Sequence, residues 1–414
     1  MDGVPRRARR LRTLGVVAAA LVLSLLAGEV LVRLWSHRDD TGQRWVGNLR
    51  LIPYQLPQAQ IRTTLERLQD GDTFLAYDAE LGWAPRPNAQ SESGPFRVNG
   101  AGIRSDAETS LATPPGVLRI ALFGDSFTFG DEVGAGDTWG AKLERALVER
   151  GVKAEVLNFG VNAYGMDQAY LRWQRDGRRY HPAIVIYGFQ PENVLRNLNV
   201  FRPLYFASTE VPLAKPRFVI RDGALALHDV PTIPPGEMAD VLAALPNHPL
   251  IADERYFAPW YAPRWWLHSE AVALLETLVV TRDGALFRID DEGQELAVRL
   301  AGEFARDVEA HRAAFLVLHL PRKQDLRTMR AGSEPWYGAL AHALADRFAM
   351  VDPTRGLVAI DDTLFEPRGH YAAALNQMIG EALVEPVLQA AHRDRPATAA
   401  GTKTRGARRG VLPH

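Results

Sequence analysis

The chain has 414 residues, of which 47% are hydrophobic and 23% are charged, and this is the composition of a globular protein with a large core. It contains no cysteine, which excludes disulfides, thiolate catalysis and cysteine-ligated metal sites. Both ends of the chain are basic, so the net charge of −1 conceals a middle part with a net charge of about −10. Such an acidic body offers no electrostatic footprint for nucleic acid, and we exclude that function class.

The N-terminal part predicts a membrane anchor. Residues 1–13 carry five arginines, and the segment 14–35 that follows is predominantly apolar. As a helix, its 22 residues reach about 33 Å, enough to cross a bilayer core of about 30 Å. Because clustered arginines stay in the cytoplasm, we expect a basic cytoplasmic tail over 1–13, a transmembrane helix over 14–35, and all later residues on the periplasmic or extracellular side. A cleaved signal peptide is the alternative, which we disfavour because no A-x-A cleavage site follows the apolar segment.

Residues 36–116 are expected to form a juxtamembrane arm that leads to the main domain. The segment is polar at first and then rich in Gly, Pro and Asn, with short strand-like pieces. Within it, Arg104 is interpreted as a solvated surface arginine.

From residue 117 onward, buried strands alternate with amphipathic helices. The strands are apolar runs that end in polar loops, which is the pattern of parallel strands joined by helices. The expected strands cover 117–123, 154–158, 183–187, 314–320 and 348–352. The expected helices cover 139–150, 168–179, 295–312, 336–347 and 372–392. His319, within the fourth strand, is interpreted as an interior histidine with satisfied hydrogen bonds.

Residues 198–295 interrupt this alternation and are predicted to form an insertion, or lid, on the carboxyl side of the sheet. The insertion holds a cluster of aromatic residues, which are Tyr205, Phe206, Tyr256, Phe257, Trp260, Tyr261, Trp265 and Trp266. We favour a small core of their own for these side chains over sugar stacking or membrane contact. The tail 393–414, with Pro, Thr, Gly and scattered basic residues, is predicted to be disordered.

The first functional signal is the turn Gly124-Asp125-Ser126, which follows the first buried strand. A strand that ends in Gly and then offers a hydroxyl exposes that oxygen at the carboxyl edge of the sheet, where open α/β sheets bind ligands. Ser126 is therefore a candidate nucleophile, although the tripeptide alone is a weak pattern. Asp125 is expected to support the turn through backbone hydrogen bonds and not to transfer a proton.

Three further polar loops make the pattern more specific. Gly160 follows the second strand, Asn193 follows the third, and His370 precedes the last helix. Together with the turn at Ser126, these loops resemble the four sequence blocks of the SGNH (GDSL-type) hydrolases, and the upstream VNGAGIRSD resembles membrane-anchored bacterial members. The resemblance covers about residues 117–392. It implies a flavodoxin-like three-layer α/β/α fold and Ser–His ester chemistry that deacylates glycans or lipids.

In such chemistry, Ser126 Oγ attacks an acyl carbonyl while His370 takes and returns the proton. The expected oxyanion donors are the backbone N–H groups of Ser126 and Gly160 and the side-chain amide of Asn193. Asn197 is the alternative to Asn193.

The sequence departs from the SGNH pattern in one place. The family has Asp three residues before its histidine, and here that position is Pro367. We favour Glu366 as the carboxylate that orients the imidazole of His370. Asp361, Asp362 or a backbone carbonyl are the alternatives.

Three functional hypotheses follow from these motifs. The preferred one is an extracytoplasmic serine esterase that removes acyl groups, with acetyl as the expected group, from a cell-envelope glycan or lipid. The second is an O-acyltransferase that uses the same serine to modify a polysaccharide, and the third is a non-catalytic glycan-binding protein that uses the aromatic cluster. No metal-ligand cluster or nucleotide-binding loop occurs in the sequence, so we expect no cofactor and no metal.

Overall fold

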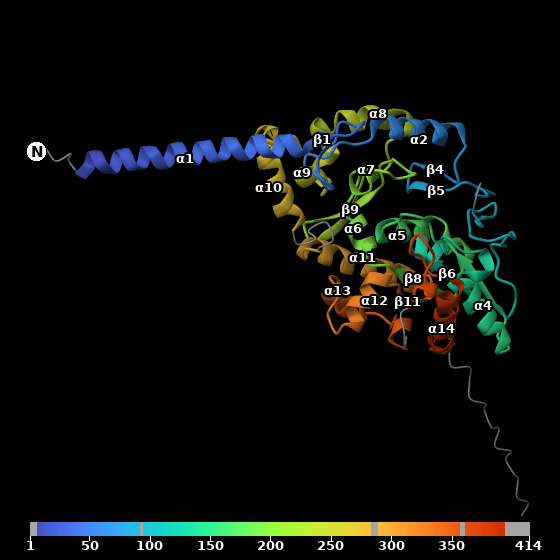
Figure 1. The fold of residues 1–414 in the computed structure, drawn as a ribbon. Helices are drawn as coiled ribbons and strands as arrows, with labels where there is room; N and C mark the ends of the chain where they lie inside the picture. Colours follow the sequence, from blue (N-terminus) through green and yellow to red (C-terminus); the bar gives the residue numbers. More distant parts are fainter. Residues whose placement is uncertain (1–5, 92–93, 283–288, 357–360, 394–414) are drawn as a thin grey trace, which may run out of the picture.

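The computed structural model describes residues 6–91, 94–282, 289–356 and 361–393. One long helix projects from a body that is built around a parallel sheet (Figure 1). The predicted disordered tail, apart from its first residue, lies outside the described residues, as do residues 1–5 of the predicted cytoplasmic tail.

A five-stranded parallel sheet forms the centre of the body, with the strand order β12-β11-β8-β6-β7. Its strands are β6 (Leu118–Phe123), β7 (Ala154–Asn158), β8 (Ile184–Phe189), β11 (Ala314–His319) and β12 (Met350–Val351). Counted within the sheet, this order is 2-1-3-4-5, the flavodoxin-like doubly wound topology. The predicted fold class is confirmed, and the strand order reverses between β6 and β8, which is where such sheets bind ligands.

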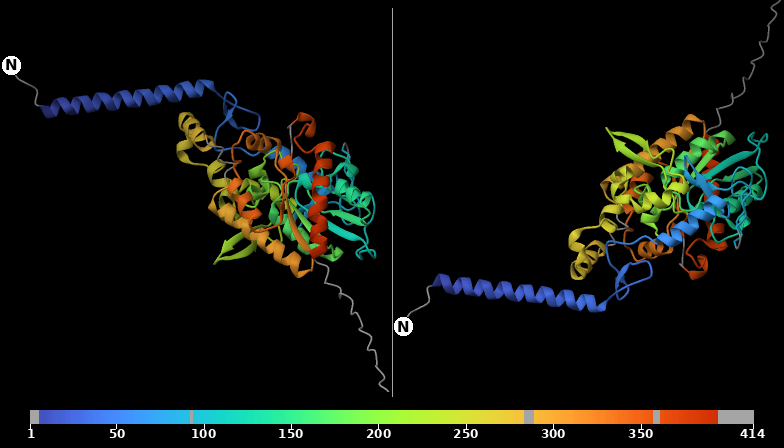
Figure 2. Two further views of the ribbon diagram at one scale, coloured as in Figure 1. Left: turned by 90° about the horizontal axis from the view of Figure 1, so that it is seen from below. Right: turned by 90° about the horizontal axis from the view of Figure 1, so that it is seen from above.

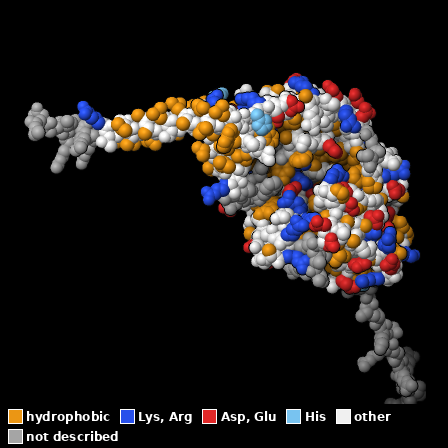
Figure 3. All heavy atoms as spheres, in the orientation of Figure 1, with side chains coloured by type: hydrophobic (Ala, Val, Ile, Leu, Met, Phe, Trp, Pro, Cys, Tyr) orange, Lys and Arg blue, Asp and Glu red, His pale blue; other side chains and the backbone are white. Residues whose placement is uncertain are grey.

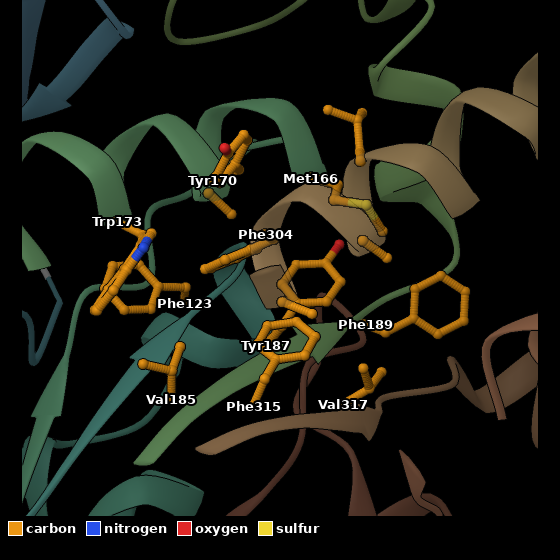
Figure 4. Close-up of a cluster of buried hydrophobic side chains, with 14 of the residues drawn as sticks. Phe123, Met166, Tyr170, Trp173, Val185, Tyr187, Phe189, Phe304, Phe315 and Val317 are labelled. Carbon is orange, nitrogen blue, oxygen red and sulfur yellow. The ribbon is translucent and has the colours of Figure 1, made fainter. Parts of the chain in front are cut away.

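Helices cover both faces of the sheet because successive strand residues point to opposite sides. Ile120 and Leu122 of β6 pack with α4 (Trp139–Glu149) and α14 (Ala373–Arg393). The other face packs against α5 (Met166–Arg175), α11 (Asp291–Ala310) and α13 (Gly338–Ala345). Figure 4 shows this second cluster, where Phe123, Tyr187 and Phe304 lie against one another. Helix α12 (Lys323–Arg330), which the sequence pattern did not predict, contributes Leu326 to the first face.

A second core joins the N-terminal arm to the insertion. The arm contains β1 (Ser36–Arg38), β2 (Arg44–Val46), β3 (Leu49–Arg50), α2 (Gln58–Asp70), β4 (Leu75–Asp78) and β5 (Gly82–Pro85). After β8 come α6 (Glu192–Arg196), α7 (Arg202–Tyr205), β9 (Arg217–Arg221), β10 (Ala224–His228), α8 (Pro235–Ala243), α9 (Phe257–Trp260) and α10 (Glu270–Thr281). Leu65 and Trp83 of the arm are buried in the same cluster as Met238 and Trp260 of the insertion. The arm, expected as an irregular segment laid against the main domain, is packed on the body and also contains helix α2.

The aromatic residues of the insertion divide into two groups. Tyr256, Phe257 and Trp260 are buried in this second core, and Tyr205 and Tyr261 are partly buried against it, as the sequence analysis favoured. Phe206, Trp265 and Trp266 are instead exposed, so the expectation of an internal core does not hold for them. The exposed tryptophans lie in a 3₁₀ turn just before α10.

Helix α1 (Arg6–Trp35) extends well beyond the body, and both views in Figure 2 show it projecting to one side. Its 24-residue part Arg12–Trp35 is long and apolar enough to cross a membrane. The predicted span 14–35 falls within that part. A signal sequence near the N-terminus passes the same test of length and composition.

Candidate active site

Ser126 is placed at the carboxyl edge of the sheet by the turn that follows β6. Gly124 has a φ of +156°, and a Cβ there would lie 2.3 Å from Thr128 Oγ1, so only glycine fits. The next residue, Asp125, accepts a hydrogen bond from the Phe127 N–H at 3.0 Å and caps the one-turn helix α3 (Ser126–Phe129). Ser126 therefore begins α3, and 9% of its surface is exposed.

Ser126, His370 and Glu132 form one row of hydrogen bonds. His370 Nε2 lies 2.9 Å from Ser126 Oγ, and His370 Nδ1 lies 2.7 Å from Glu132 Oε2. A carboxylate can only accept, so Nδ1 carries the hydrogen and the unprotonated Nε2 faces the serine hydroxyl. The side chain of His370 is 16% exposed, which leaves the row accessible from one side. The structure thus brings together the serine and the histidine that the sequence selected, which lie 244 residues apart.

Glu132 reaches the histidine because the chain doubles back directly after α3. The helix ends at Gly130 with a φ of +82°, and the N–H of Asp131 returns to the carbonyl of Ser126 at 3.0 Å. Glu132 itself has a φ of +72°, a conformation that is uncommon for a residue with a Cβ and that concentrates at functional sites.

The Glu132 carboxylate is also held by the loop that carries the histidine. It accepts the backbone N–H groups of Arg368 at 2.8 Å and His370 at 3.2 Å. Burial alone would raise the pKa of the Glu132 carboxyl, but these hydrogen bonds and the one from the imidazole outweigh burial and lower the pKa. The carboxylate therefore stays charged beside the ring.

Glu366, which the sequence analysis favoured as the partner of the imidazole, does not occupy that position. Glu366 and His370 pair through their backbones, with the Glu366 N–H donating to the His370 carbonyl at 2.8 Å. Of the two alternative carboxylates, Asp361 caps its own turn and Asp362 forms ion pairs with α12. The carboxylate at Nδ1 comes instead from the first loop, as Glu132.

Asn193 lies beside this row at the exit of β8. It is fully buried, its Oδ1 accepts from Arg196 Nη1 at 3.1 Å, and its Nδ2 donates to the Tyr187 hydroxyl at 3.3 Å. The same guanidinium nitrogen binds Asp125 Oδ2 at 2.8 Å. Arg196 therefore fixes the amide of Asn193 relative to the turn that carries Ser126. The Nδ2 of Asn193 carries a second hydrogen beyond the one that it gives to Tyr187.

The N–H of Gly160, expected as an oxyanion donor, already has an acceptor. It donates to the Oδ1 of Asn158 at 2.9 Å, and a Cβ at Gly160 would lie 2.4 Å from the backbone nitrogen of Phe129. The glycine is thus needed for close packing of the β7 exit against α3.

Arg104 is buried and not a solvated surface residue, which corrects the sequence interpretation. Only 6% of its surface is exposed, and it donates to the carbonyls of Val133 at 2.8 Å and Pro95 at 3.2 Å. Burial lowers the pKa of its guanidinium to about 10. Arg104 thereby fastens the N-terminal arm to the loop that presents Glu132.

The motifs did not identify Glu132 and Arg196, but the sequence holds a signal for each. Glu132 stands six positions after Ser126, in the carboxylate pair that follows Gly130. Arg196 stands one helical turn after Asn193, where it can reach the same edge of the sheet.

Neither a family model nor a curated protein matches the chain. Similar solved structures include a lipolytic protein of the G-D-S-L family from Desulfitobacterium hafniense, at 14% identity and TM-score 0.33, covering 65% of this chain and 98% of that one. A catalytic mutant of an acetylxylan esterase from Geobacillus stearothermophilus has 12% identity and TM-score 0.33, covering 65% and 93%. A lipase/acylhydrolase from Enterococcus faecalis has 12% identity and TM-score 0.35, covering 68% and 99%.

The 2-1-3-4-5 sheet order brings the loops after β6 and β8 to one edge of the sheet, where Ser126 meets His370.

Proposed function

We propose that this chain is a serine esterase that hydrolyses acyl esters, with Ser126 as nucleophile, His370 as general base and acid, and Glu132 as the residue that orients the imidazole. The observation that carries the proposal is the continuous row from Ser126 Oγ through both ring nitrogens of His370 to Glu132. A nucleophile within reach of a base, which is itself oriented by a third group, is the geometric signature of nucleophilic catalysis.

The first half of the reaction makes an acyl-enzyme. Ser126 Oγ attacks the ester carbonyl while its proton moves to Nε2 of His370, and the imidazolium that forms is stabilised by the charged Glu132. The tetrahedral oxyanion is met by the Ser126 N–H and the Asn193 amide. His370 then gives its proton to the leaving alcohol as the carbon–oxygen bond breaks.

The second half repeats these steps with water. His370 takes a proton from the water molecule that attacks the acyl-enzyme, and it returns the proton to Ser126 Oγ when the free acid leaves. No metal or cofactor takes part in this scheme.

We further propose that α1 anchors the enzyme and that its substrate is an acylated glycan or lipid of the cell envelope. The length and apolar composition of Arg12–Trp35 support the anchor. The arginine cluster before it favours a cytoplasmic N-terminus and a catalytic body on the other side of the membrane.

The test is hydrolysis of p-nitrophenyl acetate by the purified full chain in detergent. We expect Ser126→Ala to lower kcat by about 10³ or more, because the nucleophile is lost while binding remains. Ser110→Ala, at an exposed serine of the arm, is the matched control and should keep the wild-type rate. Equal rates for both variants would remove the proposal, provided that circular dichroism finds both folded.

A further inference from the structure

Helix α10 is apolar on its outward face as well as on the inward face, where Ala273, Leu274 and Val280 pack on the second core. Thr277 points inward and is fully buried, where its Oγ1 accepts the Ile52 N–H at 3.1 Å. Leu275 and Val279 point outward and are 62% and 73% exposed, and Leu278 is exposed with them. Surface helices normally bury their apolar stripe, so this outward stripe needs a partner outside the chain.

The turn before α10 enlarges the same apolar surface. Trp265 is 79% exposed and Trp266 is 40% exposed. The Nε1–H of Trp266 donates to Glu276 Oε2 at 2.9 Å, and Arg264 pairs with Glu276 at 2.5 Å. The Glu276 carboxylate at the edge of this surface is therefore paired with a cation. We call Trp265, Trp266, Leu275, Leu278 and Val279 the α10 surface.

The start of α10 is tied to the long apolar helix α1. The carboxylate of Glu29 accepts the Ser269 hydroxyl at 2.6 Å and the backbone N–H groups of Glu270 and Ala271 at 3.1 and 3.0 Å. Arg33 donates to the carbonyl of His268 at 3.3 Å. An anionic side chain at the first turn of a helix is favoured by the helix dipole. Together with these hydrogen bonds, that interaction holds the start of α10 against α1.

Two observations set the depth and direction of α10 relative to α1. Glu29 lies six residues before Trp35, the end of the apolar span, which is about 9 Å along the helix axis. Interfacial helices bury their apolar face about 5–10 Å into the boundary between headgroups and acyl chains, which is a similar depth. Figure 1 shows α10 running across the direction of α1, on the side of the body toward which α1 extends, and Figure 3 shows hydrophobic side chains gathered there.

We propose that the α10 surface lies in the outer interface of the same bilayer that α1 crosses, as an interfacial helix with two tryptophans at the headgroup level. The inference rests on the proposed membrane anchor and not on the esterase chemistry. Lipid is favoured as the occupant because the surface continues directly from the candidate span through the Glu29 junction. Tryptophan is also a side chain that prefers this interface. Exposed Arg282, at the end of α10, would meet anionic headgroups.

The absence of cysteine allows a direct test with single-cysteine variants of the full chain. Val279→Cys reports on the α10 surface and Leu23→Cys on α1. Val148→Cys on α4 is the control, since Val148 is also an exposed valine of the body, at 54% against 73% for Val279. Each variant is labelled with an environment-sensitive fluorophore. It is then reconstituted into vesicles of equimolar phosphatidylcholine and phosphatidylglycerol, with or without bromine on the acyl chains. Esterase activity of each labelled protein is measured in parallel as a check of folding.

We expect brominated lipid to lower the emission at positions 279 and 23 by roughly twofold or more and to leave position 148 unchanged, because bromine quenches only groups that reach the acyl region. Quenching at 23 but not at 279 would overturn the inference and leave the anchor intact. Quenching at neither position would remove both. If 279 escapes bromine but two copies crosslink through it, the α10 surface is an interface between copies, which also overturns the inference.

Discussion

The catalytic edge and the α10 surface both place side chains in environments that their polarity disfavours, but only the first supplies their partners from within the chain. At the catalytic edge, buried Asp125 and Asn193 both accept hydrogen bonds from buried Arg196, which offsets the cost of burying these polar groups. At α10, exposed Leu275 and Val279 find no such cover within the described residues.

The difference separates two kinds of function. A polar network that is closed within the chain preorganises chemistry, because its groups need not rearrange when charge develops on the substrate. An apolar surface without cover instead indicates a partner that arrives from outside. The following substitutions test this difference between the two regions.

The largest effect is expected at the carboxylate of the row. Glu132→Gln should lower kcat for p-nitrophenyl acetate by about 10²–10⁴, because a neutral amide neither stabilises the imidazolium nor fixes the ring tautomer. The sequence-favoured carboxylate provides the control, so Glu366→Gln should keep nearly the full rate. If Glu366→Gln were the damaging change and Glu132→Gln were harmless, the geometric assignment would be wrong.

The next effect concerns the oxyanion donor. Asn193→Ala should reduce kcat by about 10²–10³ with little change in KM, since the lost hydrogen bond forms mainly in the transition state. Steady-state kinetics separates the two constants. A rise in KM at unchanged kcat would assign Asn193 to substrate binding instead.

Helix α10 allows the contrast to be measured as stability. Thr277→Val should lower the free energy of unfolding by about 1–3 kcal/mol, because it leaves the buried Ile52 N–H without an acceptor. Leu275→Gln and Val279→Gln should change it by less than about 0.5 kcal/mol in detergent, since both side chains are exposed. Denaturation of the three variants decides this, and large losses for the glutamine variants would mean that these leucine and valine side chains pack within the protein.

The smallest effect is expected at the carboxyl of Asp229, which lies outside the polar network of Arg196. Burial raises the pKa of Asp229, whose Oδ2 has no hydrogen-bond partner among the described residues, to about 7. The folded protein therefore holds this proton more tightly than the unfolded chain, and the carboxyl lowers stability as the pH rises from about 4 to about 7. Asp229→Asn should remove at least about 1 kcal/mol of that decline, as followed by urea denaturation across this pH range.

Asparagine is a suitable replacement because residue 229 has a φ of +60°, which asparagine tolerates. Parallel pH profiles for wild type and Asp229→Asn would show instead that the carboxyl titrates alike in the folded and unfolded states.

The parts of the fold that follow local rules were predictable from the sequence. Strand β6 was placed to within one residue, because a strand buried on both faces is a short, nearly continuous apolar run. Ser126 and His370 were found because each lies beside a distinctive loop at one edge of the sheet. His319, which binds the Tyr337 hydroxyl at 3.0 Å, is a satisfied interior histidine as expected.

What could not be predicted depends on contacts between distant segments. Glu132 becomes the partner of His370 only because a left-handed turn meets a loop 238 residues away. Arg104 and helix α2 are buried by segments whose arrangement no local pattern encodes. The α10 surface was not predicted, because the sequence pattern does not distinguish an apolar residue that is exposed from one that is buried.

Intact-protein mass spectrometry after reaction with a fluorophosphonate, which labels an activated serine, tests whether Ser126 is the nucleophile. We expect one phosphonyl adduct on the wild type, mapped to Ser126, a much slower adduct on Glu132→Gln, and none on Ser126→Ala. An adduct of equal yield on Ser126→Ala, or labelling of the wild type at another serine, would contradict the assignment of Ser126 as the nucleophile.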